Sequence, residues 1–162
     1  MRLNKDGTAT LLVKGAEVSL PVPTWGQVKG RKEAFEKMIE SLALIFTTVL
    51  DTMTEDEKRI YDRILQEKSR RTAASTKEGL TADEEYNLLP EDGQERVLSL
   101  FKAVQNQINT GKELAAHWWV DTVKLLTEVE VASDDLPSSL ASTDSVSTYL
   151  NHVQTVPFQS GP

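Results

Sequence analysis

The stretch from Thr24 to Met53 has the highest density of apolar residues in the chain. Its apolar side chains recur at three- and four-residue steps, which is the period of one helix face. The recurring residues are Phe35, Met38, Leu42, Ile45 and Val49, and Ile39, Phe46 and Leu50 widen the stripe. A helix that is apolar over so much of its circumference must be covered on several sides. The stretch therefore predicts a central helix in a packed, mainly helical domain.

The beginning of this helix carries a local signal. Thr24 followed by Gln27 is the pattern of a capping box, in which each residue satisfies the backbone N–H of the other. Gly30 weakens the first turns, because glycine is a poor helix former. We therefore expect the helix to be interrupted near Gly30 and to run firmly only from Arg31.

A β-hairpin is predicted before the helix. Two β-rich runs, residues 8–13 and 17–20, flank a turn at residues 14–16, in which Gly15 takes a positive φ. Prolines after the second run end it. An earlier turn is expected at residues 4–7.

Three further helices are predicted downstream. Thr54 and Glu57 form a second capping box, which predicts a helix over residues 55–71. Two more are expected over residues 91–109 and from Thr110 to Glu128, separated by a stop at Thr110-Gly111. Residues 86–90 are interpreted as a short apolar bridge between elements.

The last part of the chain differs in composition. Residues 125–162 contain five acidic side chains and no Lys or Arg. Asp134 begins a pattern typical of a helix start, with Pro137 in its first turn. A short amphipathic helix is expected over residues 145–153, and the end of the chain, with Pro157, is expected to fray.

The fold class that follows is α+β, mainly α, with an N-terminal hairpin, about four helices and a short C-terminal helix. We expect one domain over residues 1–130, with a mobile linker at about 72–83. Residues 131–162 are expected to form a partly ordered acidic segment.

Composition limits the class of function. The formal net charge of −7 argues against binding to nucleic acid or to anionic lipid. The chain has no cysteine, so disulfides and thiolate metal sites are impossible. The longest apolar run, residues 42–50, is far shorter than the ~20 residues of a membrane span. With no secretory signal at its start, the chain is expected in the cytoplasm.

No catalytic motif stands out. His117 and His152 are isolated from any metal-binding spacing, and a two-His site would need the fold to bring them together. The acidic runs 83–85 and 91–92 lie in polar sequence, which favours solvated clusters over a general acid–base pair. Phosphate-binding loops and serine-nucleophile motifs are absent from the sequence. We expect no enzyme activity and no cofactor.

Two features suggest binding to a partner protein. Leu44, Phe46 and Leu50 extend the apolar surface of the first helix beyond one stripe, so part of it could remain exposed. Trp118 and Trp119 point about 100° apart on a helix, so one ring could fill the core while the other meets a partner. A core-only role for both remains the alternative.

Both ends of the chain resemble one family. The start runs from Gly7-Thr8-Ala9-Thr10-Leu11 through Val18-Ser19-Leu20-Pro21 to Thr24-Trp25-Gly26-Gln27. The end has Trp118-Trp119, Asp134-Asp135-Leu136-Pro137-Ser138-Ser139-Leu140-Ala141, and Leu150-Asn151-His152. This layout is similar to tail assembly chaperones of long-tailed (siphovirus-type) actinobacterial phages. Ser139 departs from the pattern, which would have an aromatic residue there.

The resemblance implies a non-enzymatic protein of bacteriophage tail morphogenesis in the host cytoplasm. Such chaperones coat the tape measure protein and deliver tail tube protein, so these are the implied partners, and a homo-oligomer is left open. The alternative is a virion structural or adaptor protein that forms an oligomer through the same apolar surface.

Overall fold

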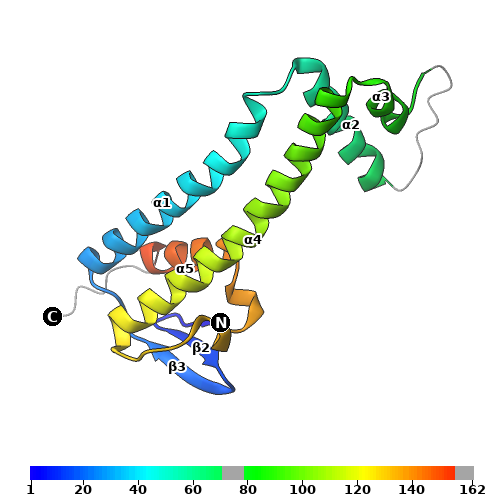
Figure 1. Cartoon of the computed structure of the whole chain (residues 1–162). Helices are drawn as coiled ribbons and strands as arrows, with labels where there is room; N and C mark the ends of the chain where they lie inside the picture. The colour runs from blue at the N-terminus through cyan, green and yellow to red at the C-terminus, as the bar shows by residue number, and fades with distance from the viewer. Residues whose placement is uncertain (71–78, 156–162) are drawn as a thin grey trace. The chain divides into compact units, whose positions relative to one another are not determined.

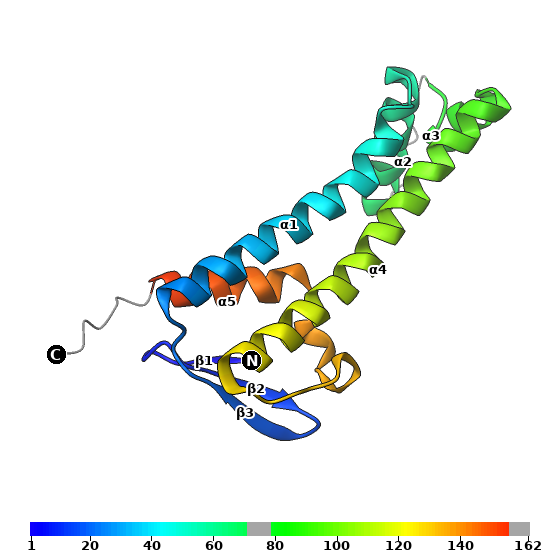
Figure 2. The same ribbon diagram turned by 60° about the vertical axis from the view of Figure 1, so that its left-hand side comes forward.

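The computed structural model describes residues 1–70 and 79–155, which form an α+β structure that is mainly helical (Figures 1 and 2). The residues group into two compact units. Unit 1 contains Met1–Leu42 and Ile108–Pro162, and unit 2 contains Ala43–Gln107. Two long helices, α1 (Trp25–Leu50) and α4 (Glu91–Thr127), contribute residues to both units. The predicted fold class is confirmed.

A three-stranded antiparallel sheet opens unit 1, in the order β1 (Arg2–Leu3), β2 (Ala9–Val13), β3 (Ala16–Leu20). Lys14 and Gly15 join β2 to β3 with φ values of 49° and 76°. Two successive positive φ values are the signature of a type I′ turn, which matches the twist of the strands. The predicted hairpin is confirmed, and so is the turn at residues 4–7, where the Gly7 N–H donates to the Asn4 carbonyl at 3.1 Å. The sequence did not reveal β1.

The helix α1 begins with the predicted capping box. The Thr24 N–H donates to Gln27 Oε1 at 2.9 Å, and the Gln27 N–H donates to Thr24 Oγ1 at 3.2 Å. The predicted interruption near Gly30 is wrong, because α1 is continuous over 26 residues. A glycine inside a helix costs about 1 kcal/mol relative to alanine, which packing of a long apolar face can offset.

The core of unit 1 lies between the sheet, α1, α4 and α5 (Thr143–Thr155). The amphipathic helix predicted at residues 145–153 corresponds to α5, and its four apolar residues are buried. Each of these elements contributes buried core residues, and the segment before α5 adds Leu140; the full set is Ala9, Leu11, Val13, Leu20, Val28, Ala115, Trp118, Trp119, Val123, Leu140, Val146, Tyr149, Leu150 and Val153. The structure therefore groups the chain differently from the predicted division at residue 130, because residues after it complete this core.

The segment that leads to α5 contains no α-helix start at Asp134, contrary to the prediction. Instead two short 3-10 turns form, η1 (Ser133–Asp135) and η2 (Ser138–Leu140). Pro137 precedes η2 in an extended conformation, with ψ near 146°. The residue before a proline is disfavoured in the helical region, which explains why the first turn cannot continue through Leu136. The predicted fraying at Pro157 lies outside the described residues.

In unit 2, the end of α1 packs with α2 (Glu55–Arg70), α3 (Ala82–Leu88) and the first half of α4. The predicted bridge at residues 86–90 is wrong in part, because its first residues belong to α3, which Thr81 caps by accepting from the Glu84 N–H. Of the predicted linker, residues 72–78 lie outside the described residues and residues 82–83 are helical. The buried core residues are Met53, Ile60, Tyr61, Ile64, Ala82, Val97 and Leu100.

The predicted stop at Thr110-Gly111 is also wrong, since α4 runs unbroken for 37 residues. Gly111 is buried, and a Cβ placed on it would lie 3.5 Å from Leu42 Cδ1. The glycine therefore marks close packing between α4 and α1 within unit 1, and not a helix end. Sequence alone cannot distinguish these two uses of a glycine.

Candidate partner-binding site

The three predicted binding residues on α1 all belong to unit 2. Leu44 is 64% exposed, whereas Phe46 and Leu50 are half-buried and pack against the core of that unit. The three side chains are therefore not exposed together. Leu44 remains as the accessible apolar anchor, with the uncovered parts of Phe46 and Leu50 on the same helix.

Polar groups follow Leu44 along α1. The hydroxyl of Thr48 donates to the Leu44 carbonyl at 2.7 Å, and the Thr47 hydroxyl approaches the same oxygen at 3.5 Å. Both threonines are exposed, and their hydroxyls are turned back onto the backbone. Because both hydroxyls donate to the backbone, the surface next to Leu44 offers fewer free polar groups than its sequence suggests.

Trp118 and Trp119 lie in the core of unit 1. They are 4% and 0% exposed, and their rings meet edge to face with centroids 4.9 Å apart. Tyr149 of α5 packs on both rings, at centroid distances of 6.1 Å from Trp118 and 5.2 Å from Trp119. Edge-to-face contacts of this kind stabilise a core beyond simple area burial.

Both indole N–H groups are satisfied within the unit. Trp118 Nε1 donates to the Arg31 carbonyl at 3.1 Å, and Trp119 Nε1 donates to Ser145 Oγ at 2.9 Å. The Arg31 guanidinium also lies over the Trp118 ring, 5.9 Å from its centroid. The core-only alternative thus accounts for both tryptophans, and neither ring is presented at the surface.

Unit 2 contains an ionic contact that sequence reasoning missed. Arg96 of α4 donates to Glu57 of α2 through Nε at 2.7 Å and Nη2 at 2.9 Å. These hydrogen bonds are the main reason why the pKa of the Glu57 carboxyl lies below its ordinary value of 4.5. Only the capping box at Glu57 has a local sequence signal; Arg96 is 39 residues away.

The acidic runs singled out in the sequence lie at helix N-termini. Residues 83–85 occupy the first turn of α3, and residues 91–92 that of α4, where negative charge is favoured by the helix dipole. Glu85 also pairs with Arg63 at 2.6 Å and Arg59 at 3.0 Å, which ties α3 to α2. The helix-dipole positions and the ion pairs therefore account for these acidic residues as contributions to the stability of the fold.

The described part of the chain contains no metal-binding site built on its histidines. His117 is exposed on α4 and His152 is half-buried on α5. Across residues 1–70 and 79–155, no group of three His, Asp or Glu side chains could hold a metal ion. Within the same ranges, no helix has the length and apolar character needed to cross a membrane.

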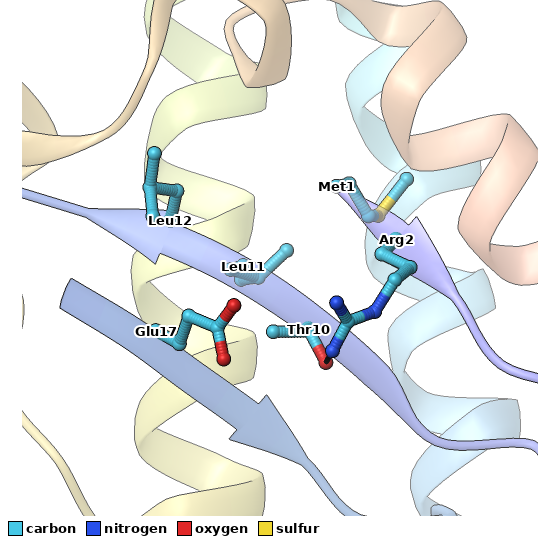
Figure 3. Close-up of a pocket in the computed structure, with 6 residues that line it drawn as sticks. All are labelled: Met1, Arg2, Thr10, Leu11, Leu12 and Glu17. Carbon is cyan, nitrogen blue, oxygen red and sulfur yellow. Dashed lines mark hydrogen bonds between the residues drawn. The ribbon is translucent and has the colours of Figure 1, made fainter. Parts of the chain in front are cut away.

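A shallow hollow of about 230 Å³ lies on the sheet (Figure 3). Its lining is Met1, Arg2, Thr10, Leu11, Leu12 and Glu17. Arg2 reaches across it and donates to Thr10 Oγ1 at 3.3 Å. The volume is smaller than that of most ligand pockets, which are about 300–1,000 Å³. The hollow therefore does not identify a small-molecule substrate.

Comparison with known proteins adds no assignment. No protein-family model matches the chain, and neither the curated proteins nor the solved structures contain a match. The candidate site is therefore interpreted from its own geometry.

Proposed function

We propose that this chain is a non-enzymatic chaperone of phage tail morphogenesis, which acts in the host cytoplasm and binds apolar helical segments of the tape measure protein. The observation that carries the proposal is the 64% exposure of Leu44 on the part of α1 in unit 2, where the other large apolar side chains, Ile45, Phe46, Val49 and Leu50, are half-buried. The resemblance at the two ends of the chain supports the same class of protein.

Recognition would use an apolar helix of the partner laid along the end of α1. Such binding depends on a few apolar anchors spaced along one helix face. Leu44 supplies the exposed anchor. Phe46 and Leu50 lie about 160° and about 120° away from it around the helix and pack against the core of unit 2, so they fix the side of α1 that Leu44 leaves accessible. The net charge of −7 would keep the chaperone soluble while it shields an aggregation-prone client.

The test is co-expression of the chain with the tape measure protein of the same phage, followed by affinity capture. Leu44→Glu should strongly reduce capture, because it places a charge at the anchor. Leu88→Glu is the matched control, since Leu88 is 71% exposed in the same unit but lies on α3. Absence of a complex, or equal loss in both variants, would contradict the proposal.

The protein content of purified phage particles distinguishes a chaperone from the alternative, a virion structural or adaptor protein. A chaperone should be absent from mature particles, and deletion of its gene should abolish tail formation. Stoichiometric presence of the chain in the particles would instead support the virion structural or adaptor role.

A further inference from the structure

The strand β3 has a free edge whose geometry follows from the hairpin. In a two-residue hairpin the closing pair, here Val13 and Ala16, exchanges both backbone hydrogen bonds. Alternation along the ladder then directs the backbone groups of Val18 and Leu20 toward β2. The N–H and C=O groups of Glu17 and Ser19 consequently point away from the sheet.

These outward groups have no backbone partner among the described residues. Figures 1 and 2 both show β3 at the margin of the sheet. Glu17 and Ser19 are exposed, and the register from Ala9–Leu20 to Val13–Ala16 is continuous, without a bulge. An unbulged edge with free donors and acceptors is a template for pairing with another strand.

We propose that β3 pairs antiparallel with β3 of a second copy of this chain, about a two-fold axis at Val18. This surface is separate from the Leu44 site, so the inference goes beyond the proposed function and does not depend on it. In this register Glu17 lies opposite Ser19 of the second copy, and vice versa. The two pairs together form four backbone hydrogen bonds.

The side chains select this register over its neighbours. Centring the pair on Glu17 would set two carboxylates directly opposite each other, which is destabilising. Centring it on Ser19 would set Pro21 opposite Glu17, and proline has no N–H to donate. Centring it on Val18 avoids both costs and allows each Ser19 hydroxyl to approach a Glu17 carboxylate.

The inner face of the sheet favours the same arrangement. Val18 points inward but is only half-buried, and packs at the margin of the unit 1 core. In the proposed register the two Val18 side chains face each other as a non-hydrogen-bonded pair, in which side chains come closest. Pairing would thus complete the burial of an apolar side chain that the single chain leaves partly open.

The occupant is a second copy because two antiparallel copies of β3 satisfy every outward N–H and C=O group of Glu17 and Ser19, with no like charges directly opposite each other. A five-residue edge is smaller than a standard protein interface, so we expect a weak, concentration-dependent dimer. Sedimentation velocity of the full chain over a wide concentration range measures the dissociation constant of this dimer. Hydrogen exchange at high concentration should show added protection at the amides of Glu17 and Ser19.

Charge variants test the register. Ser19→Lys places a cation opposite Glu17 of the second copy and should tighten the dimer, whereas Ser19→Glu opposes two carboxylates and should weaken it. Ser41→Lys and Ser41→Glu introduce the same charges at an exposed position of α1 and should leave the dissociation constant unchanged. Ser19→Pro keeps the bonds to β2, because the Ser19 N–H points outward, and should abolish dimerisation.

Circular dichroism of each variant confirms that the fold is retained. A wild-type chain that stays monomeric at every concentration would overturn the proposal. So would a dimer whose affinity responds to Ser19→Lys and Ser19→Glu in the same direction, or no more than to the Ser41 controls.

Discussion

The guanidinium of Arg96 holds the carboxylate of Glu57 through two hydrogen bonds, which join the first turn of α2 to α4. Glu57 is 3% exposed and also accepts the Thr54 N–H at 3.2 Å. One side chain therefore caps a helix and fixes its position against another. A buried carboxylate in this setting stabilises only while its partners are present.

Glu57→Ala should lower the free energy of unfolding of unit 2 by about 2 kcal/mol, because it leaves Arg96 without its main partner and removes the carboxylate that accepts from the Thr54 N–H in the capping box. Hydrogen exchange of the α2 amides measures this change in the free energy of unfolding within unit 2. Glu95→Ala is the control, since Glu95 is exposed on the same helix as Arg96. Equal effects of the two substitutions would show that the buried pair does not stabilise the unit.

The contribution of Glu57 should depend on pH. Hydrogen bonding from Arg96 lowers the pKa of Glu57 in the folded chain below the ordinary 4.5, so folding favours the ionised form. The stabilisation is therefore complete well above pH 4.5 and is lost as the pH falls through the lowered pKa. The difference in unfolding free energy between wild type and Glu57→Gln, measured by urea denaturation, should shrink on acidification. A constant difference would contradict this.

Local features of the fold could be predicted from the sequence. The capping boxes at Thr24 and Thr54 depend on residues three positions apart, and the hairpin depends on a short turn around Gly15. The burial of α5 follows from the helical spacing of its apolar residues. In each case the interaction and the pattern lie within a few residues of each other.

Features that depend on distant partners could not be predicted. The fate of Trp118 and Trp119 was ambiguous, because Ser145 and Tyr149 lie on a helix whose position the sequence does not give. Exposure of Leu44 alone, without Phe46, likewise depends on which side of α1 the core of unit 2 covers. Spacing predicts a face of a helix, and only the packing shows what covers that face.

Gly30 and Gly111, where helix interruptions were wrongly predicted, should tolerate substitution by alanine. A Cβ at Gly30 would meet nothing within 4 Å, and one at Gly111 would make an ordinary contact of 3.5 Å with Leu42. Gly30→Ala and Gly111→Ala should each raise the free energy of unfolding by about 0.5–1 kcal/mol. Thermal unfolding measures the change. Gly15→Ala is the contrasting control and should destabilise, because φ there is +76°.

Tyr149 offers a stabilising substitution of a different kind. It is 2% exposed, and its hydroxyl has no hydrogen-bond partner among the described residues. Tyr149→Phe should raise the free energy of unfolding by about 1 kcal/mol, because it removes an unsatisfied buried polar group and keeps the ring contacts with both tryptophans. Tyr86→Phe is the matched control: its hydroxyl lies 3.5 Å from the Gln94 carbonyl, so this substitution should give no gain. A loss of stability in Tyr149→Phe would reveal a partner for the hydroxyl.

The same hydroxyl should make the fold sensitive to alkali. Burial raises the pKa of Tyr149 from 10.0 to about 12, because the phenolate is poorly solvated in the core. A raised pKa means that the folded chain holds the proton more tightly than the unfolded chain, so this contribution to stability is complete below pH 10 and is lost as the pH rises toward 12. Urea denaturation should therefore show that wild type loses more stability between pH 9 and pH 11 than Tyr149→Phe does, by about 1 kcal/mol. Parallel losses in the two proteins would mean that Tyr149 ionises as freely in the folded chain as in the unfolded one.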